Sequence, residues 1–210
     1  MQILCLPLGQ LQTNCYLVSC PQTNEGIIID PADSGDFIAQ KVQELGIKPQ
    51  LIVATHGHFD HVLGALELKM ALQIPFALHP NDLPILNNVQ KSARYWLKAK
   101  ADPPPPVDRW LREGDILQFG QEKLTVIETP GHTPGGISLY DGESTLFSGD
   151  TLFRGAIGRS DYSYSNLTDL RDSLRKLLEL PTSCRVYSGH GPSTTIGEEK
   201  KNLDNWLKNM

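Results

Sequence analysis

The chain has 210 residues, of which 40% are hydrophobic and 20% are charged, and its formal net charge is −5. This length suits one compact domain, and the composition is that of an ordinary soluble globular protein. The chain has no long basic block and no apolar run near the roughly 18 residues of a membrane-spanning helix. We therefore expect neither nucleic acid nor membrane as a partner, and a start without signal-peptide features predicts a cytoplasmic location.

Short apolar runs and amphipathic segments alternate in the first half of the chain. The pattern predicts strands at residues 2–6, 14–19, 26–29, 51–54 and 75–79, and helices at 36–45, 62–72 and, in part, 81–100. Asp30 ends the third run, where we expect it to cap the next helix or to brace a neighbouring loop. The prolines at 103–106 predict a stiff loop, and residues 94–109 form a hypothetical lid on the substrate side.

The second half begins rich in strands and closes with amphipathic segments. Strands are predicted at residues 116–119, 123–128, 136–140, 145–148 and 185–188, and helices at 166–180 and 196–207. Both halves run from strands to a helix, with no linker or short repeat between them. This order suits two packed sheets with helices outside. The cysteines form no C-x-x-C pair, so we expect buried, reduced thiols at Cys5, Cys15, Cys20 and Cys184.

Four metal-capable side chains follow the buried run at 51–54: His56, His58, Asp60 and His61. His56 and His58 are two residues apart, so in an extended segment both imidazoles project to one side and can bind one ion. Asp60 and His61 fall in the first turn of the next helix and point elsewhere, which favours a second ion. The mixture of imidazole and carboxylate suits zinc, iron or manganese.

Three further candidates follow predicted strands, and each is flanked by glycine: His132, Asp150 and His190. The glycines permit tight turns and let the backbone approach an ion closely. Together with the loop at 55–61 they make a set of seven candidate ligands. His79 precedes a proline with no companion ligand near it, so we expect a structural or surface role for it.

Four motifs carry a resemblance to a known family: Leu-Gln-Thr-Asn-Cys-Tyr at 11–16, Pro-Gly-His-Thr-Pro-Gly at 130–135, Gly-Arg-Ser-Asp at 158–161 and Gly-His-Gly-Pro at 189–192. With them the chain resembles the metallo-β-lactamase-fold hydrolases over nearly its whole length, and among these the glyoxalase II-like (hydroxyacylglutathione hydrolase-like) group. The resemblance implies an α/β fold, an αββα four-layer sandwich of two mixed sheets with outer helices. It implies one domain over residues 1–210, without the extra C-terminal helical region of glyoxalase II proper.

The resemblance also implies a site with two divalent metal ions, zinc in the first place and iron or manganese as alternatives. One ion would be held by His56, His58 and His132, the other by Asp60, His61 and His190, and Asp150 would bridge them. Such ions lower the pKa of bound water to about 7 and so supply a hydroxide nucleophile at neutral pH. The residues expected to carry catalysis are Asp60, His58 and Asp150, with Asp60 also orienting the nucleophile.

Within the group, the resemblance favours hydrolysis of a small-molecule thioester of the S-lactoylglutathione type. A mononuclear iron persulfide dioxygenase ranks second, and a metal-binding sensor or redox module without hydrolase activity stays open. β-Lactam hydrolysis is disfavoured, because Asp150 stands where we expect the bridging ligand rather than a cysteine. Four cationic side chains are candidates for substrate carboxylates: Arg154, Arg159, Lys200 and Lys201.

Overall fold

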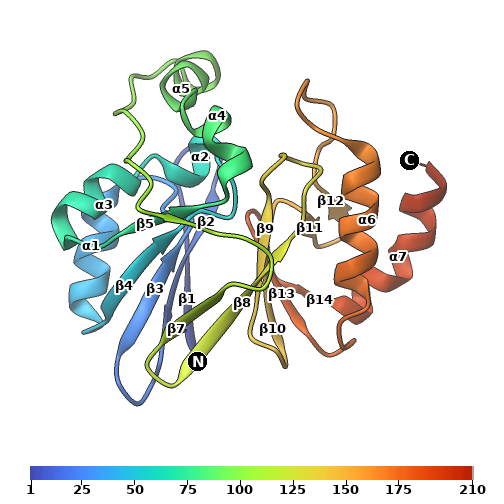
Figure 1. Cartoon of the computed structure of the whole chain (residues 1–210), viewed down its shortest axis with the longest axis horizontal. Coiled ribbons are helices and arrows are strands. Elements are labelled where there is room, and N and C mark those ends of the chain that lie inside the picture. The colour runs from blue at the N-terminus through green and yellow to red at the C-terminus, as the bar shows by residue number, and fades with distance from the viewer. Residues whose placement is uncertain (210) are drawn as a thin grey trace.

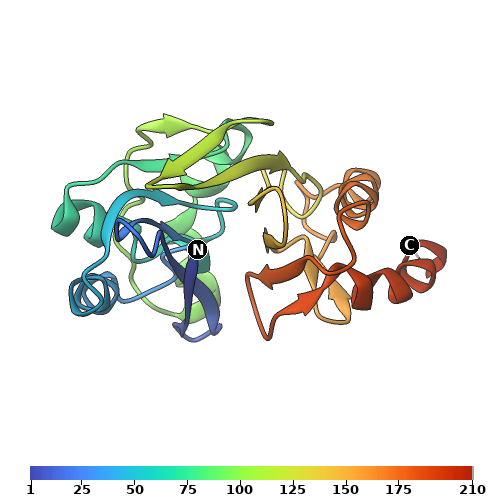
Figure 2. The same cartoon turned by 90° about the horizontal axis from the view of Figure 1, so that it is seen from below.

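The structure is a computed structural model that describes residues 1–209. Two six-stranded sheets lie against each other, and helices cover both outer faces (Figure 1). Viewed from below, the first half of the chain, in blue to green, lies beside the second half, in yellow to red (Figure 2). This is the four-layer αββα arrangement expected from the sequence.

The first sheet has the strand order β1-β2-β3-β4-β5-β6. Its first three strands are antiparallel, and the pairs from β3 onward are parallel, so the sheet is mixed. The strands are β1 (Gln2–Leu8), β2 (Thr13–Ser19), β3 (Glu25–Ile29), β4 (Lys48–Val53), β5 (Phe76–Leu78) and β6 (Arg109–Trp110).

The second sheet has the order β14-β13-β10-β9-β8-β7, and only its β10 and β13 pair is parallel. Its strands are β7 (Ile116–Phe119), β8 (Glu122–Glu128), β9 (Ile137–Tyr140), β10 (Thr145–Gly149), β13 (Arg185–Ser188) and β14 (Thr194–Thr195). A small antiparallel ribbon follows β10 and consists of β11 (Leu152–Phe153) and β12 (Ala156–Ile157).

Helices at the outer faces complete the layers. The first sheet is covered by α1 (Gly35–Glu44) and α3 (Ala65–Leu72), and the second by α6 (Leu167–Leu178) and α7 (Ile196–Asn209) (Figure 1). Short helices gather at one end of the sandwich: α2 (Phe59–Val62), the 3₁₀ turn η1 (Pro80–Asp82), α4 (Leu83–Leu86) and α5 (Val89–Leu97). Among residues 1–209, no helix is long and apolar enough to cross a membrane.

Strand periodicity explains why three layers of core form. Along β2, Leu17 packs toward the outer helices, whereas Tyr16 and Val18 pack toward the second sheet. On β10, Phe147 faces the first sheet and Leu146 faces α6. Successive side chains of a strand point to opposite faces, so a sheet that is buried on both sides needs nearly continuous apolar runs.

Two expectations need correction, the helix at 62–72 and the burial of Cys5. The helix expected at 62–72 begins only at Ala65, as α3, and Val62 ends the separate short helix α2, because the amide of Gly64 leaves the helical pattern and donates to the carbonyl of Pro31 over 2.9 Å. The region 81–100, expected to be helical in part, forms η1, α4 and α5, which confirms that expectation and divides the region into short helices. Cys5 is exposed on the edge strand β1, whereas the other three cysteines are buried as expected, and all four are free.

Candidate metal centre

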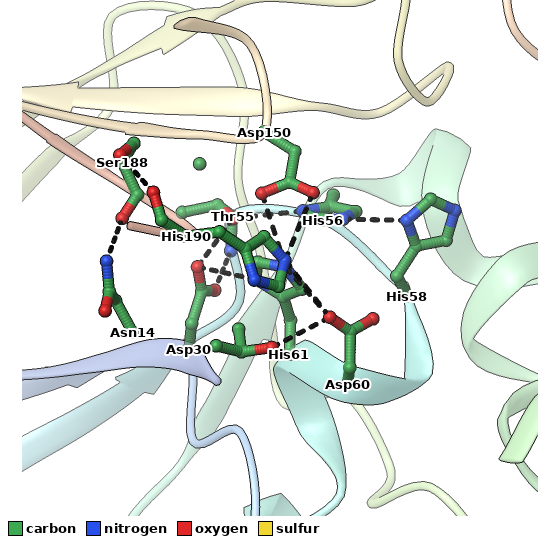
Figure 3. Close-up of polar contacts among 12 residues, drawn as sticks. Asn14, Asp30, Thr55, His56, His58, Asp60, His61, Asp150, Ser188 and His190 are labelled. Carbon is green, nitrogen blue, oxygen red and sulfur yellow. Dashed lines mark hydrogen bonds and ion pairs between the residues drawn. The ribbon is translucent and has the colours of Figure 1, made fainter. Parts of the chain in front are cut away.

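The seven candidate ligands lie together at one end of the sandwich, where loops from both sheets meet (Figures 1 and 3). Each loop leaves the carboxyl end of a strand. The first sheet contributes the loop after β4 and the start of α2, which carry four of the seven. The second sheet contributes His132 after β8, Asp150 after β10 and His190 after β13. The centre therefore joins the two sheets.

A first cluster consists of His56, His58 and His132. Nδ1 of His58 lies 2.9 Å from Nε2 of His56 and 3.1 Å from Nε2 of His132. His56 and His132 are buried, and His58 is partly exposed. Three imidazole nitrogens converge here on one point, as the two-residue spacing of His56 and His58 predicted for one ion.

A second cluster consists of Asp60, His61 and His190, and Asp150 lies between the two clusters (Figure 3). Oδ2 of Asp60 is 3.3 Å from Nε2 of His190 and 3.6 Å from Nε2 of His61. Oδ1 of Asp150 is 3.4 Å from Nε2 of His61, while its Oδ2 is 3.6 Å from Nε2 of both His132 and His190. One carboxylate thus reaches both clusters.

Two buried atoms in this centre lack any hydrogen-bond partner: Nε2 of His61 and Oδ1 of Asp150. Buried polar atoms are nearly always paired, because an unpaired one costs roughly 1–3 kcal/mol. Both atoms face the space shared by the clusters. A cation placed there would satisfy both, so the donor set and its orphaned atoms fit a divalent metal centre.

The hydrogen bonds behind the five histidines fix which nitrogen faces inward. Nδ1 of each of three histidines lies beside an oxygen that only accepts: the Asp30 carboxylate for His61 at 3.0 Å, the Arg159 carbonyl for His132 at 2.8 Å, and the Leu11 carbonyl for His190 at 3.2 Å. Each Nδ1 must therefore carry the proton, which leaves the Nε2 lone pair for a ligand.

The remaining two histidines are held in the same way. Thr55 donates its hydroxyl proton to Asp30 over 2.8 Å, so it accepts from Nδ1 of His56 at 3.1 Å. Nε2 of His58 lies 2.7 Å from the hydroxyl of Tyr164, which leaves Nδ1 of His58 for the cluster. Metal-binding histidines characteristically donate their second N–H to a fixed partner.

Bracing groups hold the loops in position. Asp30 accepts from the amide of Thr55 over 2.7 Å as well as from His61, so it braces a neighbouring loop, one of the two roles expected for it. The Thr13 hydroxyl donates to Asp60 over 2.8 Å. The Asn14 amide group donates to the carbonyls of Ser188 and Gly191, on either side of His190.

Two glycines show why the loops need small residues. Gly131 has φ +131°, and a Cβ there would meet the backbone of Leu170 on α6 at 2.2 Å. A Cβ on Gly189 would fall 2.1 Å from Oδ1 of Asp150. Both loops therefore approach neighbouring atoms more closely than any other residue permits, as the glycine flanks suggested.

The two clusters differ in the direction of the pKa shifts of their histidines. Burial and the neighbouring imidazoles lower the pKa of His56, and burial together with His132 lowers the pKa of His58 to about 3. Burial also opposes charge on His61, but the carboxylates of Asp150, Asp60 and Asp30 outweigh it and raise the pKa of His61. His56 and His58 are thus held as neutral imidazoles, the form that binds metals.

Asp82, which the sequence did not single out, ties two ligand loops together from beneath. Its Oδ2 accepts from the amide of Gly57 at 2.7 Å, and its Oδ1 accepts from the amide of Gly135 at 2.6 Å. Gly57 separates His56 from His58, and Gly135 follows His132 in its loop. His79 is buried nearby and bonds to Glu128 over 3.0 Å, which confirms a structural role for it.

A pocket of about 390 Å³ opens over the centre. Candidate ligands form its floor, Phe153 and Ile157 form one wall, and Ser92, Trp96 and Tyr164 form another. Of the four cations suggested for substrate, only Arg159 lines this pocket, and its guanidinium pairs with Asp161 at 2.9 Å. The structure does not bring the others to it, because they are exposed beyond its lining: Arg154, Lys200 and Lys201.

Comparison with known proteins identifies the family of the chain. A family model described as the metallo-beta-lactamase superfamily matches residues 8–190. The chain belongs to the metallo-beta-lactamase superfamily. Among the superfamily proteins it resembles, hydroxyacylglutathione hydrolase GloC from Haemophilus influenzae is 34% identical over 96% of each chain. The probable metallo-hydrolase YqgX from Bacillus subtilis is 36% identical over 93% of this chain and 92% of its own.

Solved superfamily structures show the same fold. TTHA1623 in a di-iron-bound form is 40% identical, with a TM-score of 0.85 over 94% of this chain and 97% of its own. The B3 metallo-beta-lactamase BLEG-1 is 33% identical, with a TM-score of 0.87 over 95% and 97%. ETHE1 from Myxococcus xanthus is 29% identical, with a TM-score of 0.81 over 97% and 83%. Membership and the cluster of histidines and aspartates together indicate a metal-dependent enzyme of the metallo-hydrolase type.

Proposed function

We propose that the protein is a dinuclear metal-dependent hydrolase that cleaves thioesters of the hydroxyacylglutathione kind. The position of Asp150 between two ligand clusters carries the dinuclear part of the proposal. Similarity to GloC over 96% of both chains supports the thioester part. The predicted assignment is kept: His56, His58 and His132 for one ion, Asp60, His61 and His190 for the other, with Asp150 shared.

Divalent ions in such a centre lower the pKa of water toward about 7 and polarise a substrate carbonyl. The protein's own groups hold the reactants in place. Asp60 keeps an ionised carboxylate in the shared space: burial raises its pKa, but the neighbouring His61 and His190 outweigh this and lower it. That carboxylate can accept a hydrogen bond from the attacking water and so orient it. Phe153, Ile157 and the tyrosines of the pocket wall shield the reacting carbonyl from bulk water.

The decisive measurement is kcat/KM for S-D-lactoylglutathione with protein loaded separately with zinc, iron and manganese, beside a chelated control. A value above about 10⁴ M⁻¹s⁻¹ that disappears on chelation supports the proposal, because ordinary efficient enzymes reach this range. His58→Ala should lose both activity and metal content. Full hydrolysis by a His58→Ala protein that retains its metal would overturn the mechanism.

Two other activities need parallel assays. The Gly-Arg-Ser-Asp motif at 158–161, which resembles that of the sulfur dioxygenases, keeps persulfide oxygenation as the second candidate, measured as oxygen uptake with glutathione persulfide and iron-loaded protein. The likeness to BLEG-1 calls for a chromogenic cephalosporin. Turnover of either compound well above that of thioesters would replace the proposal. Tight metal binding without turnover of any of them would favour a sensor or redox module.

A further inference from the structure

The wall formed by Ser92, Trp96 and Tyr164 has a second side. These three residues also line a neighbouring groove of about 480 Å³, which runs along α5 away from the metal centre. At its far side, Lys91 and Tyr95 are shared with a third hollow of about 680 Å³. The three spaces therefore follow one another along helix α5, starting at the candidate metal ligands.

In the two hollows beyond the metal pocket, the lining charge is of one sign. They are lined by four cations, Lys91, Arg94, Lys98 and Lys100, and no aspartate or glutamate lines either of them. Within the part of the chain that the structure describes, none of the four forms an ion pair. In a chain with a net charge of −5, such a strip is a local exception and attracts anions.

Aromatic surface accompanies the cations. Tyr95 and Trp96 are 66% and 54% exposed, and their rings contact each other with centroids 5.1 Å apart. Nζ of Lys98 lies 5.2 Å from the Tyr95 ring. Exposed aromatic rings beside unpaired cations suit a ligand that has both flat, partly apolar groups and negative charge.

A thioester has two parts, an acyl group and a thiol carrier. When its carbonyl lies at the candidate ligands, the 390 Å³ pocket has room for a small acyl group, and the carrier must leave past the wall. The groove along α5 begins at that wall. We propose that it binds the thiol carrier of the substrate, and that the enzyme selects thioesters whose carrier is extended and anionic, through either carboxylates or phosphates. This inference rests on the thioesterase function proposed above.

The test uses D-lactoyl thioesters of three carriers: glutathione with carboxylates, coenzyme A with phosphates, and uncharged N-acetylcysteamine. The variant is Lys91→Glu/Arg94→Glu, in metal-loaded full-length protein at low ionic strength. Its matched control is Lys48→Glu/Lys123→Glu, which makes the same charge change at exposed sites near the starts of β4 and β8, at the opposite ends of these strands from the ligand loops.

We expect the wild type to prefer at least one charged carrier. In the variant, kcat/KM for that carrier should fall about tenfold or more, mainly through KM, while the value for N-acetylcysteamine stays within about twofold. The control should match the wild type. A larger loss with coenzyme A assigns the groove to phosphates, and a larger loss with glutathione assigns it to carboxylates. Equal losses on all three carriers, or no loss, would overturn the inference.

The inference and the proposed function fail in different ways. If the wild type cleaves the uncharged thioester with the same kcat/KM as the charged ones, the hydrolase assignment stands and the carrier groove is rejected. If no thioester is cleaved, the hydrolase assignment fails. Calorimetry with S-hexylglutathione and an S-alkyl coenzyme A then tests whether the groove binds an anionic thiol carrier. Binding that the Lys91→Glu/Arg94→Glu variant weakens about tenfold supports it, and absence of binding rejects it.

Discussion

Tyr164 combines two contacts in one side chain. Its hydroxyl lies 2.7 Å from Nε2 of His58, and its ring stacks on Tyr162 with centroids 5.4 Å apart. Burial raises the pKa of Tyr164 to about 12, so the hydroxyl stays protonated at neutral pH. The hydroxyl thus holds His58 in the orientation that presents Nδ1 to the cluster, while the ring separates the metal pocket from the groove along α5.

Tyr164→Phe should therefore weaken metal binding while keeping the pocket wall. Partners of metal ligands typically contribute about 10–100-fold in affinity, and for this half-exposed tyrosine we expect about tenfold. The measurement is competition with a chromogenic chelator. Tyr162→Phe is the matched control, because Tyr162 lines the same pocket and a phenylalanine there keeps the ring stack. Equal metal affinities for the wild type and Tyr164→Phe would show that the Tyr164 hydroxyl does not support the metal centre.

At the scale of elements, apolar runs and strand periodicity located most strands of both sheets, but not their order. Strands β7 and β13 have the bounds predicted from the sequence, and the longer strands differ by a few residues at their ends. Two-residue strands such as β6 and β14 were missed, because so short a segment has no periodicity. Cys5 was predicted to be buried, since nothing in its neighbourhood shows that β1 would form an edge.

In the candidate centre, too, the sequence predicted some residues and missed others. All seven predicted ligands were found together, because metal-capable residues after buried strands leave a clear pattern. The supporting residues leave none: Asp82 looks like a helix cap, and Trp96 and Tyr164 look like surface aromatics. Only the tertiary contacts that bring η1, α5 and the segment before α6 to the ligand loops give them a role. Which ion each ligand binds, and closure of the segment 94–109, stay predictions.

Asp82→Ala tests the bracing of these loops. The change leaves the buried amides of Gly57 and Gly135 without acceptors, so we expect the free energy of unfolding of the chelated protein to fall by roughly 1–3 kcal/mol. Denaturant titration measures it. Metal affinity should fall as well, since two ligand loops lose their common anchor. Asp172→Ala removes an exposed partner of Arg175 and should change stability by less than about 0.5 kcal/mol. A loss no larger than this control would refute the bracing role.

At the scale of the whole molecule, the candidate ligands come from both sheets. A metal ion bound to them would therefore link the two layers. A ligand present at 100 times its dissociation constant stabilises a fold by about 2.7 kcal/mol, which for this length is a Tm shift of roughly 5–10 °C. Chelation should lower Tm by this amount in scanning calorimetry. In His132→Ala the effect of chelation should be much smaller. An unchanged Tm after complete metal removal would show that the layers do not depend on the ion.

The contact between the N-terminal hairpin and the last ligand loop has a consequence for biosynthesis. Thr13 forms an isolated β-bridge with His190, and the amide of Asn14 donates to the carbonyl of Gly189 over 2.7 Å. A nascent chain that has emerged only as far as the first sheet carries four candidate ligands, and the apolar face that the second sheet will cover is exposed. The centre is complete only when β13 and the loop after it have left the ribosome. The complete ligand set is therefore assembled late in synthesis, and until then the apolar face of the first sheet stays uncovered.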